Sequence, residues 1–154
     1  MSESQQSPEV LFLCTGNYYR SRTAEALFNH YAATQGVDAR AISRGLGLSA
    51  KNKGHISPHA LAWLQARGVP YERRDPLDLT AADLASARRI IAIDETEHRA
   101  MMNLRFPKWA ARIEYWVIHD LDRTGPSQAL AEIETRVRAL FGMVGASPIC
   151  LPNQ

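Results

Sequence analysis

The stretch from residue 10 to residue 35 constrains the fold more than any other part of the chain. Residues 10–13 are four consecutive apolar side chains, which is typical of a strand covered on both faces of a sheet. A short loop follows, and the next apolar residues recur at helical spacing as far as Gly36, which predicts a helix over 21–35. A strand that leads through a tight turn into a helix is where open α/β sheets place their active sites.

The loop between this strand and this helix begins at Cys14 and ends at Arg20. Its backbone N–H groups can turn inward at the helix N-terminus and form a cradle for an oxyanion such as phosphate. The Arg20 guanidinium can grip two oxygens of that anion through paired, charge-assisted hydrogen bonds, which a lysine cannot do. The same positive surroundings favour the thiolate form of Cys14, which is the nucleophilic form. The residues that would form the cradle are Thr15, Gly16, Asn17, Tyr18 and Tyr19.

Three side chains in and after the loop fit this interpretation. Gly16 allows the backbone to approach the anion, and Asn17 tolerates the positive φ that a sharp loop needs. The Ser21 hydroxyl can hydrogen-bond the thiolate and begin the helix. A free cysteine more often only packs as a small apolar residue, and a cysteine six positions before an arginine is weak evidence alone. The combination of strand, Cys-x-Gly-Asn-x-x-Arg-Ser and helix is far more specific.

At these residues the chain resembles the low-molecular-weight protein tyrosine phosphatase family. The match includes the Cys-x5-Arg-Ser signature and the segment 22–26 after it, and it extends from Val10 to about Val144. The resemblance implies a phosphocysteine intermediate on Cys14, with Arg20, Ser21 and the loop residues 15–19 around the phosphate. The thioredoxin-coupled arsenate reductases share this fold and loop, so the motif leaves both reactions open.

The rest of the chain alternates strands and helices. Further strands are predicted at 37–43, 89–93 and 113–118, with a long loop at 44–56. Helices are predicted from Pro58 to Gly68, at 94–106 and at 127–144, with a short helical turn opened by a capping box at 80–83. This alternation predicts an α/β three-layer sandwich with a parallel sheet and helices on both faces. The family resemblance implies four strands in the order 2-1-3-4.

Length and composition set the outer limits. The chain has 154 residues, 45% hydrophobic and 22% charged, which suits one globular domain. We expect a disordered leader at 1–9, the domain at 10–146 and a C-terminal tail at 147–154. No signal peptide and no apolar stretch of about 20 residues is evident, which predicts a cytoplasmic protein that does not contact a membrane. A net charge of +2 with scattered Lys and Arg predicts no nucleic-acid partner.

The cysteines and histidines predict neither a disulfide framework nor a metal site. Cys14 and Cys150 are the two cysteines, and Cys150 is interpreted as an incidental thiol in the tail. An arsenate reductase that works through an internal disulfide relay needs resolving cysteines, and none occurs at 75–97. His55 and His59 are separated by the helix start at Pro58, which disfavours a metal pair. We therefore expect no metal and no other cofactor.

A phosphatase of this kind needs an acid to protonate the leaving oxygen. The family resemblance implies an Asp in the loop after the fourth strand, usually Asp-Pro followed by aromatic residues. Here the spacing favours Asp120, with Asp122 as the alternative, and either could be a solvated turn residue. Leu121 replaces the proline and the aromatic wall is missing, although Tyr18 and Tyr19 could compensate for it.

Together these features predict a phosphatase that hydrolyses phosphomonoesters, with protein phosphotyrosine as the expected substrate. Its partners would be a phosphorylated protein or a small phosphomonoester, with phosphate or another oxyanion in the loop. The alternatives are an arsenate reductase on the same fold and a non-catalytic phosphate-binding module.

Overall fold

The computed structural model describes residues 7–121 and 123–150. It contains a parallel sheet of four strands in the order β2-β1-β3-β4, which confirms the predicted topology. The strands are β1 Val10–Cys14, β2 Ala41–Gly45, β3 Arg89–Ala92 and β4 Glu114–Tyr115. The helices are α1 Arg20–Gln35, α2 Pro58–Ala66, α3 Ala81–Ser86, α4 Glu95–Arg105, α5 Pro107–Ala110 and α6 Pro126–Cys150.

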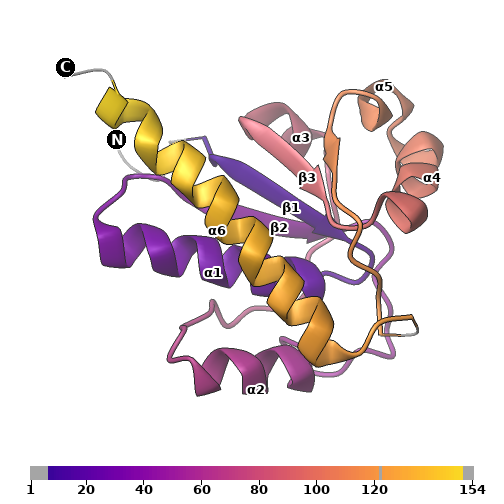
Figure 1. Cartoon of the computed structure of the whole chain (residues 1–154). Coiled ribbons are helices and arrows are strands. Elements are labelled where there is room, and N and C mark those ends of the chain that lie inside the picture. The colour runs from indigo at the N-terminus through magenta and orange to yellow at the C-terminus, as the bar shows by residue number, and fades with distance from the viewer. Residues whose placement is uncertain (1–6, 122, 151–154) are drawn as a thin grey trace.

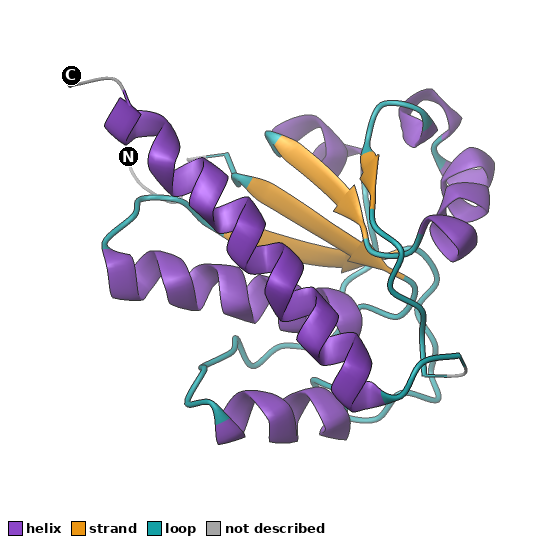
Figure 2. Ribbon diagram, in the orientation of Figure 1, coloured by secondary structure: helices purple, strands orange, loops and turns teal. Residues whose placement is uncertain are grey.

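Helices cover both faces of the sheet, as predicted (Figures 1 and 2). Helices α1, α2 and α6 lie on one side, and α3, α4 and α5 lie on the other. Side chains of β1 alternate between the two cores, because successive residues of a strand point to opposite faces. Val10 and Phe12 pack with the α1 and α6 core, whereas Leu11 and Leu13 pack with the core beneath α3 and α4. All four side chains are fully buried, as the run of apolar residues predicted.

Several predicted boundaries were wrong. Strand β2 begins at Ala41 instead of residue 37, and it continues to Gly45, where backbone bonds to Leu77 and Leu79 extend the sheet edge. Strand β4 is shorter than predicted, because only Glu114 and Tyr115 pair with β3.

The other differences concern helix ends. Pro107, which was predicted only to stop a helix, also starts the short helix α5, because proline suits the first helical position. Helix α6 continues to Cys150, six residues past the predicted end at Val144. A helix can continue beyond the last residue of its apolar face, because its backbone hydrogen bonds do not depend on that face. The division into leader, domain and tail remains a prediction, and residues 1–6 and 151–154 lie outside the description. No described helix has the length and apolar character to cross a bilayer.

The strands place the loops that follow them at one edge of the sheet, because all four strands run in the same direction. The loop 15–19 follows β1, Asp94 follows β3, and the segment with His119 and Asp120 follows β4. Gly45, at the end of β2, lets the backbone approach the first of these loops. A Cβ atom there would lie 2.8 Å from the Thr15 carbonyl oxygen, so any larger residue would push against the loop.

Candidate active site

The backbone of the loop after β1 is held from outside. Leu46 N–H donates to the Cys14 carbonyl and Gly47 N–H donates to the Thr15 carbonyl, each at 2.9 Å, and Ser57 N–H donates to the Tyr18 carbonyl at 2.8 Å. In a trans peptide the N–H points opposite to the carbonyl before it. The N–H groups of residues 15, 16 and 19 are therefore turned away from these neighbours, toward the interior of the loop. This arrangement fits the predicted oxyanion cradle.

Asn17 is the conformational pivot of the loop. It is the one non-glycine residue with positive φ (49°) in the described part of the chain, as the sequence suggested, and it is fully buried. Its Nδ2 donates to the hydroxyls of Ser21 and Ser43, both at 2.9 Å. Its Oδ1 accepts from Arg74 Nη1 at 3.0 Å and from Leu77 N–H at 2.9 Å. The side chain therefore joins the loop to α1, β2 and the segment 74–77.

Cys14 lies at the base of the loop with its thiol buried against the start of α1. Its Sγ is 2.9 Å from Ser21 Oγ and accepts from Ser21 N–H at 3.4 Å. Ser21 Oγ in turn accepts from Asn17. Both contacts from Ser21 can stabilise a negative sulfur, and this agrees with the contact expected from the sequence.

Arg20 closes the other end of the loop and is almost completely buried among acidic groups. Its Nη1 donates to the Ile118 carbonyl at 3.0 Å. Its guanidinium lies 3.1 Å from Glu97, 3.5 Å from Asp120 and 3.9 Å from Asp94. Burial alone would lower the pKa of Arg20, but the charges of Cys14, Glu97 and Asp120 raise it above its ordinary value. Arg20 is thus a permanent cation at the centre of the site.

A pocket of about 200 Å³ opens above Cys14 and Arg20. Asp120 and Leu121 lie on one part of its lining and Asn52 on another. The remaining lining residues are Cys14, Gly16, Tyr18, Tyr19, Arg20 and Ser57. All of the predicted site residues except Thr15, Asn17 and Ser21 therefore line one pocket, and Asn17 and Ser21 support it from below through Cys14.

The hydroxyl of Tyr19 is buried without a hydrogen-bond partner among the described residues. Burial raises the pKa of Tyr19 to about 12, with a further increase from the charge of Asp120 and an opposing effect of Arg20. The hydroxyl therefore stays protonated. The ring makes an edge-on contact with His59, at 6.4 Å between centroids, and so joins the loop to α2.

Thr15 was predicted to bind substrate, but its side chain is engaged on the opposite side of the loop, with α4. Its hydroxyl donates to Glu97 and lies 3.1 Å from His98 Nε2. Thr15 can therefore contribute its backbone to the cradle while its side chain attaches the loop to α4.

Asp120 is mounted at the mouth of the pocket on the segment after β4. Its Oδ1 accepts from Leu121 N–H at 2.8 Å, a bond that a proline at position 121 could not donate. Its other oxygen faces Arg20, and the carboxylate is 44% exposed, so solvent can reach it. The preceding residue, His119, anchors this segment through Nδ1, 2.8 Å from Asp94 Oδ2. Asp122, the alternative acid, lies outside the described residues.

Sequence reasoning missed supporting residues that are far away along the chain, and Arg74 and Glu97 are two of them. Arg74 donates to Asn17 and lies 3.0 Å from Glu25, and Glu97 contacts both Thr15 and Arg20. Glu97 did carry a signal, since it follows closely after the predicted strand 89–93, whose carboxyl end belongs at the active edge of the sheet. Arg74 carried none, because it lies in an irregular connection.

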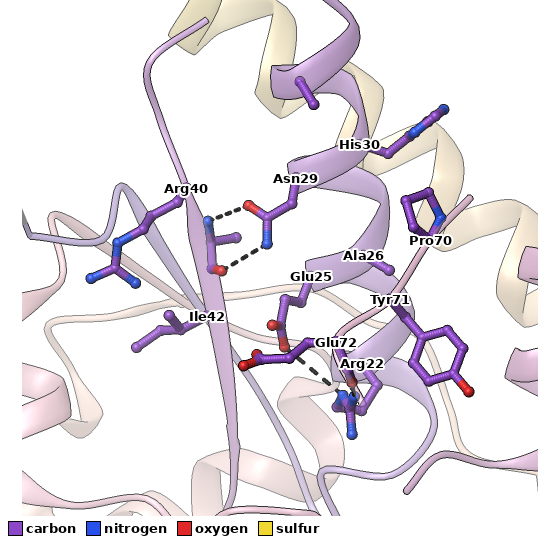
Figure 3. Close-up of a pocket in the computed structure, with 12 residues that line it drawn as sticks. Arg22, Glu25, Ala26, Asn29, His30, Arg40, Ile42, Pro70, Tyr71 and Glu72 are labelled. Carbon is purple, nitrogen blue, oxygen red and sulfur yellow. Dashed lines mark hydrogen bonds and ion pairs between the residues drawn. The ribbon is translucent and has the colours of Figure 1, made fainter. Parts of the chain in front are cut away.

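A second cavity, of about 390 Å³, lies between α1, β2 and the segment 70–72 (Figure 3). Its charged lining residues are bonded within the protein: Arg22 Nη1 donates to the His55 carbonyl at 2.6 Å, and Glu25 pairs with Arg74. Asn29 bonds both the N–H and the carbonyl of Ala41, which satisfies the outer edge of β2. Through Glu25 and Arg74, which bonds Asn17, the side chains around this cavity help to hold the loop.

In the part of the chain that the structure describes, no group of three or more His, Cys, Asp or Glu side chains is arranged to hold a metal.

The role of Asn17 leads to a prediction about stability. Asn17→Ala removes four hydrogen bonds and puts a Cβ-bearing residue without a polar side chain at positive φ, so we expect a loss of at least about 2 kcal/mol in the free energy of unfolding. Urea denaturation measures it. Asn17→Gly removes the same hydrogen bonds, but glycine adopts positive φ without steric cost. It should therefore be less destabilising than Asn17→Ala. Equal stability of wild type and Asn17→Ala would contradict this account.

Comparisons with known proteins agree with this geometry. The family model of the low molecular weight phosphotyrosine protein phosphatases matches residues 9–147. The protein-arginine-phosphatase of Bacillus subtilis (strain 168) is 28% identical over 105 residues, which are 68% of this chain and 67% of that protein.

Solved structures show the same fold. The low molecular weight protein tyrosine phosphatase from T. tengcongensis is 24% identical with a TM-score of 0.76, and the match covers 89% of this chain and 99% of that one. A thioredoxin-dependent arsenate reductase of Corynebacterium glutamicum is 25% identical with a TM-score of 0.69, over 94% of this chain and 65% of that one. The loop, the sheet order and the family model lead to one conclusion: this chain belongs to the low molecular weight phosphotyrosine protein phosphatase family.

Proposed function

We propose that this chain is a phosphatase that hydrolyses phosphorylated protein side chains through a phosphocysteine intermediate on Cys14. One observation carries the proposal. The Cys14 thiol, held by Ser21, and the Arg20 guanidinium line the same pocket, and Asp120 stands at its mouth. A nucleophile, a fixed cation and an exposed carboxylate are the three groups that such a reaction needs.

The first step forms the intermediate. The Cys14 thiolate attacks phosphorus as the bond from phosphorus to the leaving oxygen breaks, and the electron pair goes to that oxygen. Asp120, in its protonated form, gives the leaving oxygen its proton. The inward N–H groups of the loop and the Arg20 guanidinium hold the remaining phosphoryl oxygens, so the donors are in position before charge develops.

The second step releases phosphate. The Asp120 carboxylate takes a proton from a water molecule, whose oxygen attacks the phosphorus of phosphocysteine. The bond between sulfur and phosphorus breaks, and the electron pair returns to Cys14 as thiolate. Asp120 ends protonated and ready for the next substrate, and inorganic phosphate leaves. No redox partner or cofactor enters this balance.

Phosphotyrosine is the first candidate substrate. The family model bears its name, and the rings of Tyr18 and Tyr19 with the Leu121 side chain give the pocket apolar lining for a flat phenol. Phosphoarginine is the second candidate, supported by the curated relative, which is an arginine phosphatase. Once it has given its proton to the leaving group, the Asp120 carboxylate at the mouth would pair with the guanidinium that departs. Two peptides that differ only in carrying one phosphorylated residue or the other separate the candidates, through a ratio of kcat/KM of at least about tenfold.

The nucleophile gives the first test of this function. Cys14→Ser should abolish hydrolysis of an aryl phosphate, because a serine hydroxyl is a far weaker nucleophile than a thiolate. The variant should still bind phosphate in calorimetry, since the loop and Arg20 remain. Hydrolysis by the Cys14→Ser variant would contradict the covalent mechanism.

An assay of the wild-type protein with arsenate and a thiol reductant tests the reductase alternative. Turnover of arsenate without hydrolysis of any phosphorylated compound would favour that alternative.

The acid gives the second test. Asp120→Asn should slow the cleavage of phosphotyrosine far more than the cleavage of an activated aryl ester, because a phenol with a pKa of about 10 needs a proton in order to leave. We expect a loss of at least about a hundredfold on phosphotyrosine. Asp122→Asn, the matched variant, should be nearly silent on both substrates. Swapped results would move the role to Asp122, and equal losses on both substrates would show that this loop supplies no acid.

A further inference from the structure

The first turn of α4 holds the active-site loop from the side opposite the pocket. Asp94 caps this helix by accepting from Thr96 N–H at 3.2 Å, and the imidazole of His98, one turn on, is fully buried. Asp94 N–H donates to His98 Nδ1 at 3.1 Å. That bond makes Nδ1 an acceptor, so the ring hydrogen of a neutral His98 sits on Nε2. This nitrogen faces Thr15 Oγ1 at 3.1 Å and Glu97 Oε2 at 3.3 Å.

The hydrogen bonds then run in one direction. His98 Nε2–H donates to the Thr15 hydroxyl, and this hydroxyl donates its own hydrogen to Glu97. Glu97 also accepts from Arg20 Nη2, with both carboxylate oxygens, at 3.2 and 3.1 Å. One carboxylate therefore binds the residue directly after Cys14 and the arginine at the far end of the loop.

Glu97 is held as an anion. Burial by itself would raise the pKa of Glu97, but bonds from His98 and Thr15 and the charge of Arg20 hold it well below its usual range. The neighbouring carboxylate on the same turn, Glu95, is placed differently, since it pairs with Arg99 at 3.0 Å. Position on α4 alone therefore does not bring a carboxylate to the loop.

We propose that Glu97 is a positioning residue for the reaction, which fixes the orientation of Arg20 and locks it to Thr15 so that the loop has its anion-binding shape before substrate arrives. This inference rests on the proposed function. Glu97 does not line the pocket, so its effect must pass through Arg20 and the loop backbone. An arginine side chain has many rotamers. Because Glu97 fixes one of them before the anion binds, less conformational entropy is lost in each binding event.

Glu97→Gln tests this role, because glutamine keeps the size and one acceptor for Thr15 but loses the charge that holds Arg20. We expect kcat/KM to fall at least about tenfold and the Kd of inorganic phosphate, measured by calorimetry, to rise at least about fivefold. Glu95→Gln is the matched control and should change neither value by more than about twofold. Tighter or unchanged phosphate binding in a folded Glu97→Gln variant would overturn the proposal.

A double-mutant cycle separates positioning from a general effect on the fold. If Glu97 acts through Arg20, then Glu97→Gln in an Arg20→Lys background should weaken phosphate binding by less than about twofold, because the fork that Glu97 orients is already gone. Equal effects in both backgrounds would contradict the proposal. Should Glu97→Gln melt early, Glu97→Asp replaces it, since aspartate keeps the charge but is too short to hold both partners, and it should show the same direction of change.

These measurements also separate the two proposals. Wild-type protein that binds phosphate and hydrolyses aryl phosphate, with a Glu97→Gln variant that equals it, refutes only the role of Glu97. Wild-type protein that neither binds phosphate nor hydrolyses any phosphorylated substrate refutes the proposed function, and the role of Glu97 with it.

Discussion

The buried amide of Asn17 is the constraint on which the geometry of the active site depends. A residue at positive φ in the middle of a tight loop is held there only if its surroundings fix it, and here the four bonds come from α1, β2 and the segment 74–77. The chain can therefore turn its N–H groups inward without a bound anion to organise them. Preorganised donors of this kind do not have to reorient during the reaction, which is the main source of electrostatic catalysis.

The second constraint is the charge of Arg20. A buried guanidinium needs partners, and this one has carboxylates on elements that follow β3 and β4. Asp94 caps α4, Glu97 sits on the first turn of that helix, and both are fixed by further bonds, whereas Asp120 is half-exposed on an irregular segment. This difference matches the roles that we propose: the fixed Glu97 carboxylate sets the position of the cation, and the accessible Asp120 carboxylate exchanges protons with substrate and water.

The sequence predicted the parts of the site that are local and missed those that depend on tertiary packing. The strand, the loop and α1 form one continuous segment, so apolar spacing and the residue types of the loop were enough to place Cys14, Arg20 and Ser21. The link between Glu97 and Thr15 joins residues 82 positions apart, and only the folded sheet brings them together. Thr15 is an example: its place in the loop could be predicted from the sequence, but the direction of its hydroxyl, toward α4 and away from the pocket, could not. The boundaries of β2 and β4 were missed for the same reason, since edge strands end where their partners end.

The central claim is that phosphate passes through the sulfur of Cys14, and rapid mixing with an aryl phosphate tests it most directly. The released phenol should appear as a burst equal to the concentration of active sites, followed by slower steady turnover, wherever hydrolysis of the intermediate limits the rate. In protein quenched during the burst, mass spectrometry should find the phosphoryl group on the peptide that contains Cys14. Active enzyme that never carries phosphate on Cys14, or that carries it on another residue, would contradict the account.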